Sequence, residues 1–125
     1  MSKKKILVVD DEVNLTHSLR RILTATGIYE VREENRGSHA YESALEFQPD
    51  LIILDVMMPG IDGGAVAEKI QNDQHLKHIP IVFLTGIIEK QEVESTGSNI
   101  SGHTFLAKPV KPGDLIRCIE KTLGR

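Results

Sequence analysis

Residues 6–11 read Ile-Leu-Val-Val-Asp-Asp, an unbroken apolar run that ends on two carboxylates. Three later stretches repeat this design, with residues 51–54 before Asp55, 81–84 before Thr85 and 105–107 before Lys108. Short runs rich in Val, Ile and Leu are typical of strands that are buried on both faces of a parallel sheet. The four runs therefore predict four parallel strands, each followed by a polar residue.

The segments between these strands carry apolar residues at helical spacing. One face of the first helix is formed by Leu15, Leu19, Ile22 and Leu23, and Gly27 is expected to end it. The residues expected to begin the later helices are Ser38, Asp62 and Pro112. A weaker strand over residues 29–32 separates the first two helices.

Five strand–helix pairs joined by right-handed crossovers predict an α/β fold, a three-layer doubly wound (βα)5 sandwich. The flavodoxin-like strand order 2-1-3-4-5 is favoured, because the weak second strand suits an edge of the sheet. The fourth helix is the least regular part of the pattern. We expect it over residues 89–94, followed by a long loop, because residues 95–102 have turn composition.

The composition excludes several classes of protein. With 125 residues, 40% of them hydrophobic and 26% charged, the chain has the size and composition of one folded domain over residues 1–125. Its net charge of −3 argues against a nucleic-acid surface. No apolar stretch approaches the length of a membrane span. The single cysteine, Cys118, cannot form an internal disulfide, which favours a cytoplasmic location.

The polar residues at the strand ends predict a functional site. Ligands of open parallel sheets bind at the carboxyl ends of the strands, where Asp10, Asp11 and Asp55 would meet Thr85 and Lys108. A carboxylate such as Asp55 can attack a phosphoryl group, but it needs a metal to offset the growing negative charge. Oxygen ligands favour Mg²⁺, for which Mn²⁺ can substitute.

The other residues have matching roles in this chemistry. Asp10 and Asp11 would supply the metal site, one of them directly and the other through water, since Mg²⁺ keeps several waters. Lys108 can hold a phosphoryl oxygen by its charge, and the Thr85 hydroxyl can hydrogen-bond another. Each residue alone is common at a turn or on a surface. Their convergence on one edge of the sheet favours the functional interpretation.

Four sequence blocks resemble the receiver domain of the response regulators of two-component signalling, and the resemblance covers essentially the whole chain. The blocks are Leu-Val-Val-Asp-Asp-Glu at 7–12, Leu-Asp-Val-Met-Met-Pro-Gly-Ile-Asp-Gly at 54–63, Leu-Thr-Gly at 84–86 and Leu-Ala-Lys-Pro at 106–109. The departures are the heavy charge of residues 32–37 and the sequence Asn-Ile-Ser-Gly-His at 99–103. The second departure leaves the length of the fourth helix open.

The resemblance assigns a role to each site residue. It implies that Asp55 is the phosphoacceptor and that Mg²⁺ is held by Asp10, Asp11, Asp55 and the backbone carbonyl of Met57. It implies that Thr85 and Phe105 are the switch residues. It also implies that Lys108 contacts the phosphoryl group and is followed by a cis bond to Pro109.

The function implied is that of a signalling domain rather than an enzyme. A histidine kinase or a histidine phosphotransfer protein would donate the phosphoryl group, and the output partner is open. Neither membrane nor nucleic-acid binding is expected, and a homodimer would form through the fourth helix, fifth strand and fifth helix. Two alternatives are a phosphohydrolase of the haloacid-dehalogenase type and a phosphorylation-independent interaction domain. The first needs Asp-x-Asp at the first strand and a cap region. The second is disfavoured by the intact acid pair, Asp55 and Lys108.

Whether the chain is a complete regulator or a receiver from a larger protein stays open at this point.

Overall fold

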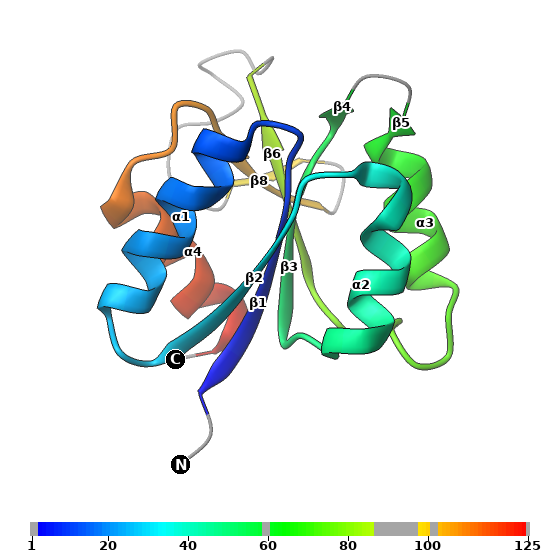
Figure 1. Cartoon of the computed structure of the whole chain (residues 1–125), viewed down its shortest axis with the longest axis horizontal. Coiled ribbons are helices and arrows are strands. Elements are labelled where there is room, and N and C mark those ends of the chain that lie inside the picture. The colour runs from blue at the N-terminus through cyan, green and yellow to red at the C-terminus, as the bar shows by residue number, and fades with distance from the viewer. Residues whose placement is uncertain (1–2, 59–60, 87–97, 101–102, 125) are drawn as a thin grey trace.

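The computed structural model describes residues 3–58, 61–86, 98–100 and 103–124. Strands and helices follow one another along the chain (Figure 1). The first half contains β1 (Lys4–Val9), α1 (Val13–Ala25), β2 (Tyr29–Glu34), the 3-10 helix η1 (Gly37–His39), α2 (Ala40–Phe47) and β3 (Leu51–Asp55). The second half contains β4 (Met57–Met58), β5 (Ile61–Asp62), α3 (Gly63–Gln71), β6 (Ile81–Thr85), β7 (Ser98–Ile100), β8 (His103–Ala107) and α4 (Pro112–Leu123).

The main sheet has the order β2-β1-β3-β6-β8-β7. Its first five members are parallel and confirm the predicted order, with β6 and β8 as the fourth and fifth parallel strands. Beyond them, β7 pairs antiparallel with β8, so that Ser98 faces Phe105 and Ile100 faces His103. The prediction of a loop over residues 95–102 is therefore wrong at Ser98–Ile100. A polar segment can pair with an edge strand because the ladder is made by the main chain.

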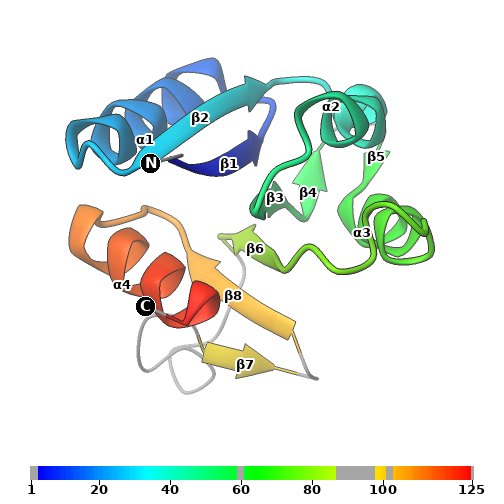
Figure 2. The ribbon, with the colours of Figure 1, turned by 90° about the horizontal axis from the view of Figure 1, so that it is seen from below.

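Helices cover both faces of the sheet, as Figure 2 shows in a view from one end. Alternation of side chains along β1 sends Ile6 and Val8 into one core and Leu7 and Val9 into the other. The first core is closed by α1 and α4, and the second by α2 and α3. The fold is the predicted three-layer α/β sandwich.

Most predicted element boundaries agree with the structure. The α1 helix ends at Ala25 and Thr26 caps it. Gly27 follows in a left-handed conformation with φ of 80°, which glycine adopts without strain. The carboxylate of Asp62 caps α3 by accepting a hydrogen bond from the Gly64 N–H at 2.9 Å. Pro112 is the first residue of α4.

Two predictions near β2 need correction. The strand continues two residues beyond the predicted Arg32, because Val8 and Val9 of β1 still pair with Glu33 and Glu34. Ser38 does not cap α2, since it lies inside η1 and the capping position is His39, whose side chain makes no capping hydrogen bond. The main chain of η1 supplies the contact instead, with the Ala40 N–H donating to the Gly37 carbonyl.

The fourth helix predicted over residues 89–94 lies outside the described residues. Among the helices that are described, none has the length and apolarity needed to cross a membrane.

Candidate functional site

Register places the predicted site residues at neighbouring strand ends. Asp55, the last residue of β3, pairs with Leu84, and Thr85, the last residue of β6, pairs with Ala107 just before Lys108. Asp10 follows Val9, which pairs with Leu54. The strands thus deliver a carboxylate, a hydroxyl and an ammonium to one edge, as parallel topology requires.

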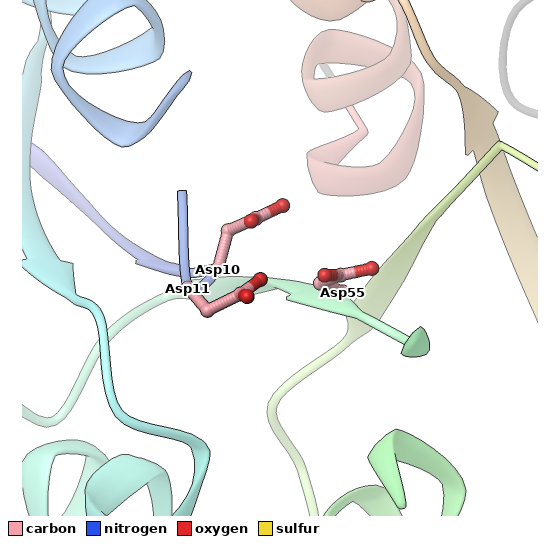
Figure 3. A group of neighbouring side chains, drawn as sticks. All are labelled: Asp10, Asp11 and Asp55. Carbon is pink, nitrogen blue, oxygen red and sulfur yellow. The ribbon is translucent and has the colours of Figure 1, made fainter. Parts of the chain in front are cut away.

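Three carboxylates converge there, as Figure 3 shows. Asp10, Asp11 and Asp55 each offer an oxygen that lies within 4.8 Å of the other two. Asp10 and Asp55 are buried, with 0% and 1% exposure, whereas Asp11 is exposed. Such a group can hold one divalent cation that remains open to solvent on the Asp11 side.

Lys108 is the positive charge within this cluster. Its Nζ lies 2.9 Å from Asp10 Oδ2, 3.5 Å from Asp55 Oδ2 and 3.5 Å from Glu12 Oε1. Burial is the largest single influence on the Lys108 pKa and lowers it, but the three carboxylates together leave the pKa raised. Lys108 therefore stays charged, and the predicted cis bond to Pro109 is present.

Asp10 and Asp55 keep one buried oxygen each that suits a cation. Asp10 Oδ1 accepts the Glu12 N–H at 2.9 Å, and Asp55 Oδ1 accepts the Met57 N–H at 3.1 Å. Both Oδ2 atoms are buried and have no hydrogen-bond partner among the described residues, although Lys108 lies at ion-pair distance. Buried carboxylate oxygens need a charged partner, so the residues present fit Mg²⁺. Burial raises the pKa of Asp10 more than Glu12 and Lys108 lower it.

Beyond Asp55 the backbone enters a two-stranded sheet and then a helix that lies close to the end of β3. Met57 pairs with Asp62 in the two-stranded β4–β5 sheet, and its side chain is 61% exposed. The α3 helix then begins at Gly63, where a Cβ atom would lie 2.5 Å from the Asp55 carbonyl oxygen and 2.6 Å from Val56 Cα. Only glycine permits this approach, which puts the start of α3 directly against the end of β3.

Thr85 and Phe105 lie on one face of the sheet. Thr85 is buried at 4% exposure and is two residues from Phe83, so their side chains point the same way. Phe83 pairs with Phe105, and the two ring centroids are 5.5 Å apart. Phe105 also lines a cavity of about 330 Å³ whose other walls are Val56, Gly64, Ala67, Glu68, Gln71 and Phe83.

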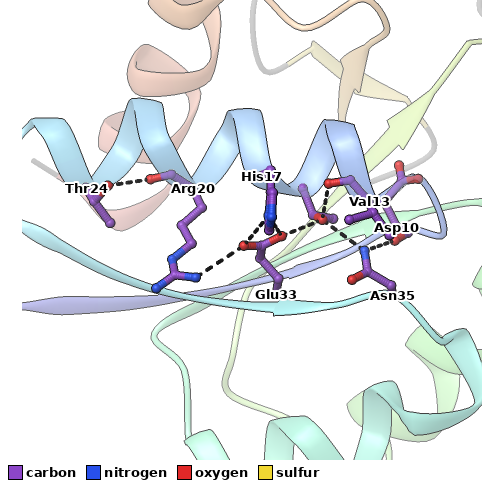
Figure 4. Close-up of polar contacts among 8 residues, drawn as sticks. Asp10, Val13, His17, Arg20, Thr24, Glu33 and Asn35 are labelled. Atoms are coloured by element: carbon purple, nitrogen blue, oxygen red, sulfur yellow. Dashed lines mark hydrogen bonds and ion pairs between the residues drawn. The ribbon is translucent and has the colours of Figure 1, made fainter.

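The sequence did not predict a hydrogen-bond network that contacts the main chain of Asp10. Asn35, just beyond β2, donates a hydrogen bond to the Asp10 carbonyl, and Thr16 and Glu33 continue the network (Figure 4). Glu12 was also not predicted to contact Lys108. The one available signal was the unusual charge of residues 32–37, which shows that polar side chains gather there but not what they contact.

Comparisons with known proteins agree with this geometry. Residues 6–120 match the family described as the response regulator receiver domain. Over 123 residues the chain is 36% identical to ycf27 of Porphyra purpurea, named as a transcriptional regulator, covering 98% of this chain and 49% of that protein. The chain thus spans about half the length of that relative. Over 124 residues it is 30% identical to the polar-differentiation response regulator DivK of Brucella ovis, covering 99% and 98% of the two chains.

Two solved structures show the same fold. The Vibrio cholerae chemotaxis protein CheY4 superposes with a TM-score of 0.80 at 28% identity, covering 96% of this chain and 98% of that one. The receiver domain of the sensor histidine kinase PA1611 of Pseudomonas aeruginosa gives a TM-score of 0.80 at 25% identity, covering 99% and 100%. That structure has a magnesium ion coordinated in its active-site cleft.

Proposed function

This chain belongs to the response regulator receiver domain family, and we propose that it accepts a phosphoryl group onto Asp55. The donor would be the phosphohistidine of a histidine kinase or of a histidine phosphotransfer protein. The observation that carries the proposal is the convergence of Asp10, Asp11 and Asp55, with Lys108 beside Asp10 and Asp55, at the carboxyl ends of β1, β3 and β8.

In the proposed reaction, an Asp55 carboxylate oxygen attacks phosphorus while the bond from phosphorus to the donor's imidazole nitrogen breaks. Asp10, Asp11, Asp55 and the Met57 carbonyl would hold Mg²⁺, or Mn²⁺ in its place, which when bound offsets charge on the attacking and transferred oxygens. Lys108 sits within reach of Asp55 and would hold a phosphoryl oxygen. Thr85 would donate its hydroxyl to another.

The signal would pass from Thr85 to Phe105. We propose that the phosphoryl group draws the Thr85 hydroxyl toward Asp55 and that the Phe105 ring then moves inward. The shared face of Thr85, Phe83 and Phe105 and the cavity beside Phe105 support this coupling. The altered surface would present β8 and α4 to an output partner or to a second copy of the chain. A transcriptional output, as in the name of ycf27, is one candidate.

We propose a cytoplasmic signalling domain and not an enzyme that turns over a free substrate. Its chemistry would be limited to its own phosphorylation and slow dephosphorylation. The free and buried thiol of Cys118 suits a reducing compartment.

Mass spectrometry after incubation with acetyl phosphate tests the assignment of Asp55. The wild type should gain one phosphoryl group only when Mg²⁺ or Mn²⁺ is present, and Asp55→Asn should gain none. The matched control is Asp50→Asn, because Asp50 flanks the opposite end of the same strand and accepts a hydrogen bond from the Lys5 N–H. Phosphorylation of Asp55→Asn at the wild-type yield would refute the assignment. Steady release of phosphate from a phosphomonoester would favour a phosphohydrolase.

A further inference from the structure

We infer that Asn35 is a positioning residue for the acid pair: its amide holds the peptide that joins Asp10 to Asp11 and so sets the Mg²⁺ affinity of the site. The inference rests on the proposed function, since it concerns the same metal site. It assigns a role to a residue that lies outside every sequence block on which the resemblance depends.

The contacts of Asn35 are short and their direction is fixed by chemistry. Asn35 Nδ2 lies 2.8 Å from the Asp10 carbonyl oxygen and 2.9 Å from Thr16 Oγ1. A carbonyl oxygen can only accept, so the atom that faces it must be the amide nitrogen with its two hydrogens. Asn35 therefore ties the end of β1 to α1 from the end of β2 (Figure 4).

Thr16 is oriented by a carboxylate on its other side. Its hydroxyl lies 2.7 Å from Glu33 Oε1 and 3.0 Å from the Val13 carbonyl. A hydroxyl has one hydrogen, and the nearer, charged carboxylate takes it. The lone pairs of Thr16 Oγ1 then face Asn35, which fixes the amide in the orientation that reaches Asp10.

Glu33 is itself held in place from α1. His17 Nδ1 lies 2.7 Å and 2.9 Å from its two oxygens, and Arg20 Nη1 lies 3.4 Å from Oε2. The contacts form a chain that runs from the exposed face of α1 through Glu33 and Thr16 to Asn35. Each donor in this chain faces a carboxylate, hydroxyl or carbonyl oxygen that can accept its hydrogen.

The peptide between the two acids is the end point of this chain. On its other side Asp10 donates its N–H to the Glu34 carbonyl at 3.1 Å. The main chain is therefore attached to the last residue of β2 before the Asp10 Cα and to Asn35, the next residue, after it. Rotation of the Asp10–Asp11 peptide would swing the Asp11 carboxylate away from Asp10 and Asp55.

Asp11 depends on this attachment more than Asp10 does. The Asp10 carboxylate is buried and contacts Glu12 and Lys108, whereas the exposed Asp11 side chain has no hydrogen bond or ion pair to other described residues. Its position near the metal site is therefore set by its backbone. Groups that orient metal ligands typically change affinity by about 10- to 100-fold when removed. We expect Asn35→Ala to weaken Mg²⁺ binding about 10-fold.

Calorimetric titration of the full chain with Mg²⁺ at pH 8 tests the inference. Asn35→Asp has the same shape but presents a carboxylate to the Asp10 carbonyl, so it should bind Mg²⁺ as weakly as Asn35→Ala. Added negative charge alone would have the opposite effect, and tighter binding by Asn35→Asp than by the wild type would overturn the inference. Thr16→Ser, which keeps the hydroxyl, should stay within about twofold of the wild type, while Thr16→Val should lose about threefold.

Two control variants separate positioning from general stability. Ile70→Val removes a methylene from the core on the opposite face of the sheet, and Asn72→Ala removes an exposed asparagine amide at the end of α3. Both should bind Mg²⁺ as the wild type does, even where Ile70→Val lowers the melting temperature as much as Asn35→Ala. If Asn35→Ala lowered the melting temperature but left the Mg²⁺ affinity unchanged, the inference would be overturned and the proposed function would stand. A wild-type protein that neither binds Mg²⁺ nor accepts a phosphoryl group would refute the proposed function as well.

Discussion

The two halves of the functional edge are built differently. On the side of β1, the Asp10 carboxylate contacts Lys108 and Glu12, and Asn35 holds the peptide that joins Asp10 to Asp11. On the side of β6 and β8, Phe105 packs on Phe83 and borders a cavity of about 330 Å³. The first half has fixed geometry, which metal binding requires, and the second has room for a side chain to move. The proposed function would use both properties, and this chain separates them along one sheet edge.

Lys108→Met is expected to have the largest effect of the variants that test this difference between the two halves. Removal of a preorganised charge from phosphoryl oxygens should slow phosphorylation by acetyl phosphate about 100-fold. Mg²⁺ affinity should rise in the same variant, because Nζ otherwise competes for the oxygens of Asp10 and Asp55. Rate and affinity are measured on one preparation. Lys69→Met is the control, since Lys69 Nζ lies 4.4 Å from the centroid of the Tyr41 ring and the ion pairs of Asp10 and Asp55 within the described structure are with Lys108. A parallel fall in both quantities would mean that Lys108 helps to build the metal site.

The second prediction concerns the side of β6 and β8, where the cavity lies beside Phe105. Thr85→Ala should still accept a phosphoryl group, because Asp55, the acid pair and Lys108 remain, but most of the change at Phe105 should be lost. NMR signals of the Phe105 ring, with and without beryllofluoride, report that change. Thr24→Ala is the matched control, since its hydroxyl bonds the Arg20 carbonyl on the exposed side of α1. If Phe105 changed in Thr85→Ala as fully as in the wild type, the change at Phe105 would not depend on Thr85.

The third prediction tests the support on the acid side through pH. Burial raises the pKa of Glu33, but hydrogen bonds from Thr16, His17 and Arg20 outweigh it and leave the pKa lowered. A lowered folded pKa stabilises the protein above the unfolded value and loses that stabilisation as pH falls through the folded value. Glu33→Gln should therefore be less stable than the wild type by about 1 kcal/mol at pH 7.

Urea unfolding from pH 7 down to pH 3 measures this difference, which should shrink toward the acid end. Glu30→Gln is the control, because Glu30 is an exposed residue of the same strand. A difference that stayed constant with pH would show that the ionised carboxylate is not what stabilises the network.

The smallest effect is expected at Met57. Its side chain is 61% exposed beside Asp55 and cannot orient a water molecule for attack on phosphorus. Met57→Asn should therefore speed phosphate loss from the phosphoprotein by roughly two- to threefold. Ile87, two residues after Thr85, is a second apolar residue of this segment of the sequence and lies outside the described residues. Release of phosphate is compared with that from Ile28→Asn, which changes an exposed apolar residue just before β2. Equal rates of phosphate loss from the wild type, Met57→Asn and Ile28→Asn would show that Met57 does not control the lifetime of the phosphoryl group.

Sequence alone predicted the sheet and the strand-end residues because both depend on local patterns. An apolar run such as residues 51–54 marks a buried strand, and the residue after it must emerge at the edge. The pairing of β7 and the 3-10 turn at Ser38 were not predictable in this way, because main-chain hydrogen bonds form them with little regard to side chains. The Asn35 network was missed for another reason. Its members come from β2 and the residue after it, from α1 and from the loop after β1, and the periodicity within one element does not reveal contacts between several elements.

The close approach of Gly63 to Asp55 has a consequence for how the domain can vary. A single added carbon at position 63 would meet the main chain of the residue proposed to carry the phosphoryl group. A Cβ at Gly86, which follows Thr85 on the neighbouring strand, would meet no described atom within 4 Å. Two glycines at the same edge therefore differ in the space that the described residues leave for a side chain. Among the described residues, position 86 has room for an added Cβ atom, whereas a replacement at position 63 would have to be matched by a shift of α3.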